Sequence, residues 1–254
     1  MSDASDQVLA HNEVTAETRP HQPPLAENNR RLRTAELCLV LFVAFAGALS
    51  LSVYTALTGA HVYASTPSRA LNFGAVIQEL AGLGVLFYVL FRQGRRPKDL
   101  GFTFSWTDLP LSVGVAIMAL IVEVVAMQVL LRGYYLATGH NLNTTPQNVE
   151  FVSSGSAVWT LVLIFINPFF EELIVRAYLM SELQSLTGSS VVAVVFSVAL
   201  QSTYHLYQGL SSALISAALF TVFSIYYIKT RRIVPVILAH FYFDLMAVAY
   251  YWWP

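Results

Sequence analysis

One apolar stretch late in the chain holds ionisable side chains at a spacing that suits acid–base chemistry. It reads NPFFEELIVRAYL and contains Glu171, Glu172 and Arg176. Glu172 and Arg176 are four residues apart with the acid first, which is the favourable order for an ion pair on a helix. This pairing leaves Glu171 without a cation nearby in the sequence. We therefore interpret Glu171 as a candidate general base, with a purely structural three-residue network as the alternative.

Two histidines extend this candidate site. His205 occurs in QSTYHLYQG and His240 in AHFYFDLMA, where Asp244 follows one helical turn later on the same face. An aspartate at that position can orient the imidazole, share a metal, or donate a hydrogen bond when it is protonated. A single histidine in a membrane helix is more often a hydrogen-bond donor between helices. Two histidines together with a paired glutamate motif favour a reactive site.

The composition indicates the surroundings in which these side chains lie. Of the 254 residues, 56% are hydrophobic and 11% are charged. A soluble domain of this length could not bury so much apolar surface, so the composition predicts a membrane protein. The net charge of −1 provides no basic surface for nucleic acid. The one cysteine, Cys38, allows neither an internal disulfide nor a cysteine-based zinc site.

Seven apolar segments are long enough, or nearly long enough, to cross a hydrocarbon core, which takes about 20 helical residues. The sequence therefore predicts an all-α fold, a polytopic membrane helical bundle of about seven transmembrane helices. The segments are 35–59, 71–92, 109–131, 157–180, 189–207, 210–228 and 233–253. Gly209 alone separates the fifth from the sixth, which predicts an antiparallel hairpin or a broken helix. The polar residues 1–34 are predicted to be a disordered cytosolic tail.

The basic residues predict the orientation in the membrane. They cluster before the first segment, after the second and between the sixth and seventh: Arg30, Arg31 and Arg33; Arg92, Arg95, Arg96 and Lys98; Lys229, Arg231 and Arg232. If the seven segments alternate, all three clusters lie on one side, with only Arg69 and Arg132 on the other. By the positive-inside rule, we expect a cytosolic N-terminus and an external C-terminus.

Two further carboxyl groups, Glu79 and Glu123, lie in the second and third segments. An ionisable group in the hydrocarbon core costs about 2.5–3.5 kcal/mol on insertion scales, so each of these groups is expected to face protein or water. Each is interpreted either as a contact of the active cavity or as a protonated carboxyl hydrogen-bonded between helices. The sequence does not decide between the two.

The depths in the membrane that straight helices predict for the candidate residues do not all agree with a single site. Glu171 and His205 lie equally far along the chain from a turn at Gly188, which predicts similar heights on two antiparallel helices. His240 is only about nine residues, or roughly 13 Å, from the basic loop. On straight helices the two histidines would lie at different depths. The Gly188 turn must then project beyond the bilayer, or the fifth helix must be tilted.

At these residues the sequence resembles the type II CAAX prenyl protease family, also called the CPBP or Abi family of intramembrane proteases. The family pattern is EExxxR, then FxxxH, then HxxxN or HxxxD. The chain carries it as Glu171-Glu172-Leu-Ile-Val-Arg176, Gln201-Ser-Thr-Tyr-His205 and His240-Phe-Tyr-Phe-Asp244. Gln201 replaces the usual phenylalanine, so the second motif keeps only its histidine. Asp244 replaces the commoner asparagine, and an ionised aspartate cannot donate a hydrogen bond.

The resemblance implies hydrolysis of a peptide bond within the membrane, by a transmembrane protease domain at 35–254 whose motif-bearing core is 157–254. It assigns catalytic roles to Glu171, His205, His240 and Asp244, supported by Glu172 and Arg176. Glu171 is expected to deprotonate a water that His205 helps to position. His240, with Asp244, is expected to stabilise the oxyanion.

Several points stay open at this stage. A second version of the mechanism places a divalent metal such as zinc on His205 and His240 together with a glutamate. The expected partners are the lipid bilayer and a membrane-associated peptide or protein substrate, and the expected location is the plasma membrane if the source is bacterial. The alternative function is a catalytically silent membrane scaffold or bacteriocin-immunity factor that acts by partner binding. A proton-coupled transporter is disfavoured because the sequence contains no evident inverted repeats.

Overall fold

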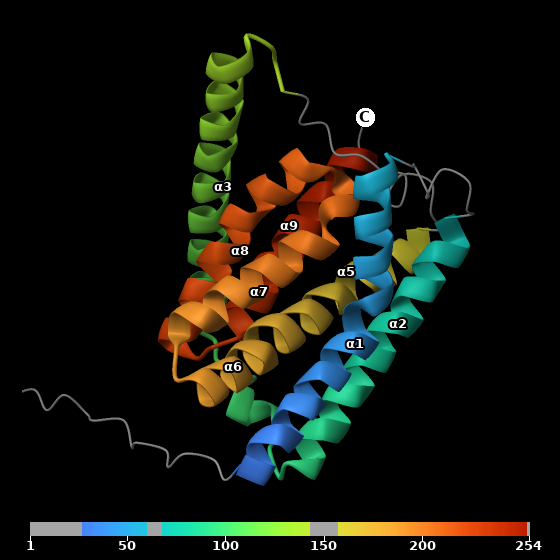
Figure 1. Ribbon diagram of the computed structural model, residues 1–254, viewed down its shortest axis with the longest axis vertical. Coiled ribbons are helices and arrows are strands. Elements are labelled where there is room, and N and C mark those ends of the chain that lie inside the picture. Colours follow the sequence, from blue (N-terminus) through green and yellow to red (C-terminus); the bar gives the residue numbers. More distant parts are fainter. Residues whose placement is uncertain (1–26, 60–67, 143–156, 253–254) are drawn as a thin grey trace, which may run out of the picture.

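The structure, a computed structural model, describes residues 27–59, 68–142 and 157–252, and all regular elements in these ranges are helical (Figure 1). The prediction of an all-α membrane bundle is confirmed. In chain order the elements are α1 (Glu27–Thr58), α2 (Ser68–Arg92), η2 (Pro97–Leu100), α3 (Asp108–Thr138), α5 (Ala157–Glu171), η3 (Glu172–Leu179), α6 (Met180–Thr187), α7 (Ser190–Tyr204), η4 (Leu206–Gln208), α8 (Leu210–Thr230) and α9 (Val234–Trp252).

Each of the seven predicted apolar segments falls on a helix. Within the described ranges, five helical stretches are long and apolar enough to cross a membrane, while α7 and α9 are apolar but shorter. Large apolar side chains such as Leu57, Phe91 and Leu136 are more than 80% exposed on the outer faces. A bilayer covers such side chains at no cost, since lipid tails are as apolar as leucine. The chain is an integral membrane protein.

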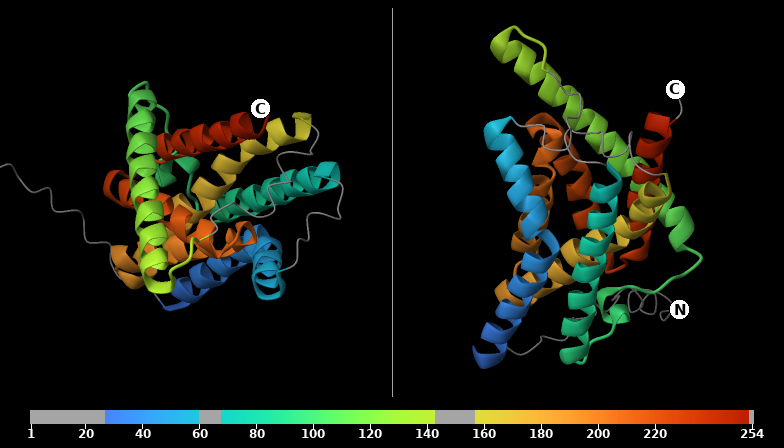
Figure 2. Two further views of the ribbon diagram at one scale, coloured as in Figure 1. Left: turned by 90° about the horizontal axis from the view of Figure 1, so that it is seen from above. Right: turned by 90° about the vertical axis from the view of Figure 1, so that its right-hand side faces the viewer.

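The helices pack in two groups that meet at the centre of the bundle. α3 packs against α8 and α9, whereas α2 packs against α1 and α5, and Figure 2 shows α3 and α2 on opposite flanks. The continuous run from α5 through η3 to α6 crosses between the two groups, oblique to α3 in Figure 1. All eight residues of η3 are buried. The stretch that carries Glu172 and Arg176 therefore lies at the centre of the molecule.

The fourth predicted segment is longer than expected and changes its winding along the way. It runs without a break to Thr187 instead of ending at residue 180. Pro168 lies inside α5, and the helix then widens into the π-helix η3. π-helical turns are rare in proteins overall, but those that occur are often found at functional sites. They alter the direction of side chains within a continuous helix.

The junction between α7 and α8 is a hairpin. The two helices pack against each other, joined by η4 and Gly209. Gly209 adopts φ 98° and ψ 152°, a conformation that favours glycine. Of the two interpretations left open by the single glycine, the antiparallel hairpin is the one present.

The start of α1 differs from the prediction of a polar tail over 1–34. Residues 1–26 of that tail lie outside the described ranges, but the rest of it is helical and forms the first turns of α1. Contacts with α6 explain this. Arg33 donates to both carboxylate oxygens of Glu182, at 2.8 and 2.7 Å, and Arg30 donates to a backbone carbonyl of α6 at 3.0 Å. These partners are distant in sequence, so composition alone could not predict them.

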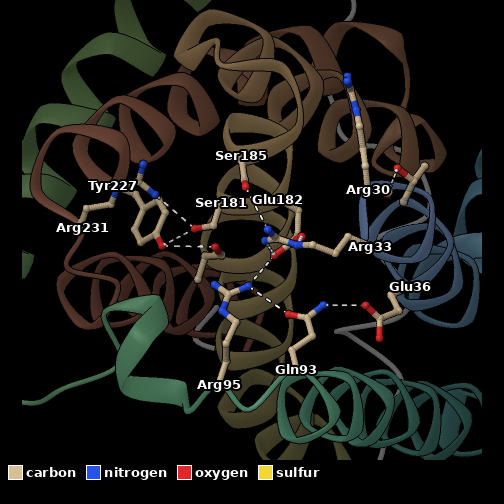
Figure 3. A network of polar contacts seen from close by, with 12 residues as sticks. Arg30, Arg33, Glu36, Gln93, Arg95, Ser181, Glu182, Ser185, Tyr227 and Arg231 are labelled. Carbon is tan, nitrogen blue, oxygen red and sulfur yellow. Dashed lines mark hydrogen bonds and ion pairs between the residues drawn. The ribbon is translucent and has the colours of Figure 1, made fainter. Parts of the chain in front are cut away.

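All three basic clusters send a side chain to α6 (Figure 3). Arg33 and Arg95, from the first and second clusters, both bind Glu182, with Arg95 at 2.5 Å. Arg231, from the third, donates to Ser181 Oγ at 3.2 Å. Glu182 is fully buried beneath these groups. We call Arg33, Arg95 and Glu182 the α6 cluster. Together with the Arg231–Ser181 contact, it places the three basic clusters at the same end of the bundle.

Candidate active site

The site forms where α5 passes into η3, between α7 on one side and α9 on the other. Glu171 ends α5 and Glu172 begins η3, and both carboxyl groups are buried. Successive residues of a helix point in different directions. Glu171 contacts Gln201 of α7, whereas Glu172 contacts His240 of α9. The paired glutamates therefore serve two different sides of the site.

Glu172 connects two of the predicted residues. Its Oε2 lies 3.3 Å from Arg176 Nε, which confirms the ion pair predicted from the spacing. Its Oε1 lies 2.8 Å from His240 Nδ1. The other ring nitrogen, Nε2, lies 3.6 Å from Asp244 Oδ1, within ion-pair range but beyond a hydrogen bond. His240 thus lies between two carboxylates, with Nδ1 engaged and Nε2 only loosely paired.

Arg176 is fully buried, which requires compensation for its charge. The ion pair with Glu172 provides part of it. The guanidinium carbon also lies 5.1 Å from the centre of the Phe220 ring and 5.9 Å from that of Phe223, both on α8. Cation–π contacts of this kind are strongest when desolvated. Arg176 therefore fixes η3 against α8 and neutralises Glu172.

Glu171 accepts a short hydrogen bond from Gln201, whose Nε2 lies 2.5 Å from Glu171 Oε2. Gln201 is fully buried on α7. In the sequence, Gln201 is evident only as a departure from the phenylalanine of the family pattern. The one signal for its role was an amide in an apolar helix, one turn before His205. The structure makes Gln201 a direct contact of the candidate base.

His205 follows the end of α7, where its Nδ1 lies 2.9 Å from the backbone carbonyl oxygen of Gln201. With the proton on Nδ1, the imidazole donates there and leaves Nε2 as an acceptor. The ring packs 5.1 Å from Phe220. The same Phe220 ring contacts the guanidinium of Arg176, so His205 borders the group that Arg176 forms with Glu172 and His240. α7 runs obliquely to α3 in Figure 1, which agrees with a tilted fifth helix, one of the two alternatives that the depth of the histidines left open.

Two residues from outside the three motifs, Asn167 and Glu79, reach the site. Asn167 lies one turn before Glu171, and its amide has hydrogen bonds in only one of its two orientations. In that orientation its nitrogen donates to Glu171 Oε1 at 3.2 Å and to Glu79 Oε1, on α2, at 3.0 Å. Glu79 is therefore a contact of the site. Glu123, on α3, forms no hydrogen bond or ion pair with another described residue.

Three residues could hold a divalent cation. Glu171, Glu172 and His240 each place a ligand atom within 4.8 Å of the other two. Carboxylate oxygen and imidazole nitrogen are both zinc ligands, so this donor set fits such an ion. The predicted metal pair was His205 and His240, and His205 is not a member of this group. Both oxygens of Glu172 already contact protein groups, His240 and Arg176.

The fold and the site together define a polytopic membrane protein with a buried carboxylate–histidine centre. The sequence model of a family described as type II CAAX prenyl endopeptidase Rce1-like matches residues 153–246. This stretch contains all three motifs. No curated protein and no solved structure matches the chain.

The match confirms the resemblance drawn from the motifs. Over residues 153–246 the chain is similar to the type II CAAX prenyl endopeptidase family, which supports a CAAX-type intramembrane protease in general. Glu79 and its helix α2 lie outside the matched region.

Proposed function

We propose that the protein is an intramembrane endopeptidase that hydrolyses a peptide bond of a membrane-associated protein or peptide, using water activated by Glu171. The observation that carries the proposal is the environment of Glu171. This buried carboxylate is held on one oxygen by Gln201 and on the other by Asn167, and it lies in one buried group with Glu172 and His240. A carboxylate fixed in this way is suited to accept a proton from water as the water attacks a carbonyl.

His205 positions the attacking water. Its Nδ1 is engaged by a backbone carbonyl, and no described residue contacts Nε2 by a hydrogen bond. In the tautomer with Nδ1 protonated, Nε2 accepts a hydrogen bond from the water. Two acceptors, Glu171 and His205, then orient the same water molecule toward the scissile carbonyl.

His240 stabilises the oxyanion that forms when water adds to the carbonyl. The carboxylate of Glu172 at Nδ1 stabilises the doubly protonated ring. Nε2–H then points away from Glu172, and its 3.6 Å separation from Asp244 leaves it able to donate to a developing charge. Asp244 keeps this side of the ring facing the site. Donors aimed at developing negative charge often make the largest single contribution to catalysis.

A divalent cation is compatible with the same centre. Bound by Glu171, Glu172 and His240, such an ion would polarise the substrate carbonyl and acidify a bound water. The roles assigned above, with Glu171 as base and His240 as oxyanion donor, are those of the centre without such an ion, because a ring nitrogen that binds a metal carries no proton.

The proposed catalytic core is 157–254, within a membrane domain that includes the earlier helices. We also propose a cytosolic N-terminus, because the three basic clusters lie at one end of the bundle. If the source is bacterial, the membrane that the protein spans is the plasma membrane.

The test compares Glu171→Gln with the wild-type chain in proteoliposomes. The probes are two quenched-fluorescent peptides, one ending in a farnesylated CAAX sequence and one forming a single transmembrane helix. We expect Glu171→Gln to lower kcat at least about 100-fold, the scale of a lost general base. Glu123→Gln is the matched control, because it makes the same change at a carboxyl outside the site, and it should leave kcat unchanged.

Full cleavage by Glu171→Gln would refute Glu171 as the base. Loss of wild-type activity on dialysis against a chelator, with recovery on adding zinc, would assign water activation to a metal. If neither probe is cleaved, Glu171→Gln is used as a substrate trap in native membranes. Failure of the trap to enrich any protein relative to wild type would favour a silent scaffold.

A further inference from the structure

A buried carboxyl group from outside the family-matched region is connected to the candidate base through one amide. Glu79 is on α2, which precedes residues 153–246, and it is 7% exposed. Its Oε1 accepts from Asn167 at 3.0 Å, while its Oε2 is buried without a hydrogen-bond partner among the described residues. A carboxyl group with so few partners is costly to bury. Its retention at this position needs a reason.

Asn167 connects Glu79 to Glu171 through a single nitrogen. An amide NH2 group has two hydrogens, and the two carboxyl oxygens lie within 3.2 Å of that nitrogen, one for each hydrogen. The position of the amide therefore depends on Glu79, and one oxygen of Glu171 depends on the amide. Gln201 holds the other oxygen of Glu171. Without Glu79, only one of the two donors of Glu171 would keep its orientation.

The packing of α2 against α5 brings Glu79 to this place. One turn after Glu79, a Cβ atom built on Gly82 would lie 2.6 Å from Phe170, the residue before Glu171, and 3.3 Å from Ala44 of α1. The residue before Glu79, Gln78, donates to the backbone carbonyl of Val43. α2 is thus seated tightly against α5 and α1 at the height of the site.

We propose that Glu79 is a positioning residue of the active site, which orients the Glu171 carboxylate through the Asn167 amide. The proposal rests on the proposed function, because it assumes that Glu171 is the base. It extends the site beyond the family-matched region to α2. Glu79 does not touch the substrate in this role, so its removal should slow the chemical step and leave substrate binding unchanged.

The experiment measures kcat, KM and the melting temperature of four variants in proteoliposomes with the same two probes. Glu79→Ala and Asn167→Ala should each lower kcat about 10- to 100-fold with KM unchanged, the usual effect of losing a supporting partner. Glu79→Gln should recover most of the wild-type kcat, because its carbonyl oxygen still accepts from Asn167. The double variant Glu79→Ala/Asn167→Ala should lose no more than either single variant, since both act through one contact.

Other outcomes overturn the proposal. A wild-type kcat in Glu79→Ala, or losses that multiply in the double variant, would exclude action through Asn167. A lower melting temperature with unchanged kcat in the folded fraction would make Glu79 a packing residue. If Glu79→Ala does not fold, the test compares kcat of Glu79→Gln with kcat of Asn167→Ala. Equal kcat values of these two variants would refute the inference. Full activity of Glu171→Gln instead refutes the proposed function itself.

Discussion

Replacing Gln201 by leucine tests whether the departure from the family pattern takes part in the chemistry. The substitution removes the donor that lies 2.5 Å from Glu171 Oε2 and keeps a side chain of similar size. The Gln201 Oε1 atom has no partner in the described structure, so no second group loses a hydrogen bond. His205 binds the backbone carbonyl of this residue, a contact that leucine preserves. The change therefore acts on Glu171 alone.

The size of the effect follows from the nature of the lost bond. A hydrogen bond to a charged group contributes about 1.5–3 kcal/mol. If Glu171 needs this bond to hold its reactive orientation, the loss appears in the barrier, and kcat falls about 10- to 150-fold. KM should not change, since Gln201 is fully buried and does not reach a bound peptide.

The assay is the cleavage of the two quenched-fluorescent peptides in proteoliposomes, with kcat and KM determined separately. Gln184→Leu is the control, because Gln184 lies on α6 and, among the described residues, its side chain donates only to Ser190 Oγ, at 2.8 Å. Gln201→Phe, which installs the residue of the family pattern, should also lose activity, because the donor is absent. A wild-type kcat in Gln201→Leu would refute the reasoning, since Glu171 would then need only one donor.

Two further predictions concern stability. Gly82→Ala should lower the melting temperature and destabilise the protein by about 1–3 kcal/mol, because the added Cβ would lie 2.6 Å from Phe170; Gly84→Ala, with nothing within 4 Å, is its control, and equal melting temperatures would contradict the close packing of α2. Glu182→Ala should destabilise the protein, because it leaves Arg33 and Arg95 without their buried partner. The loss for a fully buried pair is about 3–5 kcal/mol, and the partial exposure of the two arginines makes the expected loss smaller. Thermal unfolding in detergent measures this, and an unchanged midpoint would show that the α6 cluster adds nothing.

Contacts within one helix could be predicted from the sequence, and they are present. The Glu172–Arg176 ion pair and the His240–Asp244 approach both follow from four-residue spacing, which the helix rise fixes regardless of tertiary structure. The apolar segments likewise predict where helices form, because the hydrocarbon core sets their length. The order and spacing of the three motifs likewise indicate the family without any information on geometry.

Contacts between helices could not be predicted in the same way. Glu79, Asn167 and Gln201 meet Glu171 only because α2, α5 and α7 adopt particular tilts and rotations. In a membrane helix the lipid-facing and the protein-facing sides are both apolar, so hydropathy does not reveal the rotation. Tilt depends on packing with neighbours, which a segment length does not determine. The sequence identifies Glu79 as an ionisable residue in an apolar segment, but it does not predict the contact of Glu79 with Asn167.

The α6 cluster also has a consequence for the order in which the protein is assembled. Arg33 and Glu182 are 149 residues apart in the chain. At a synthesis rate of about 5–20 residues per second, Arg33 waits roughly 7 to 30 s for its partner to leave the ribosome. During that interval the first turns of α1 lack the contact that orders them. This ion pair therefore cannot form until every residue up to Glu182 has been synthesised, so the first turns of α1 gain this contact only after the central helix has been made.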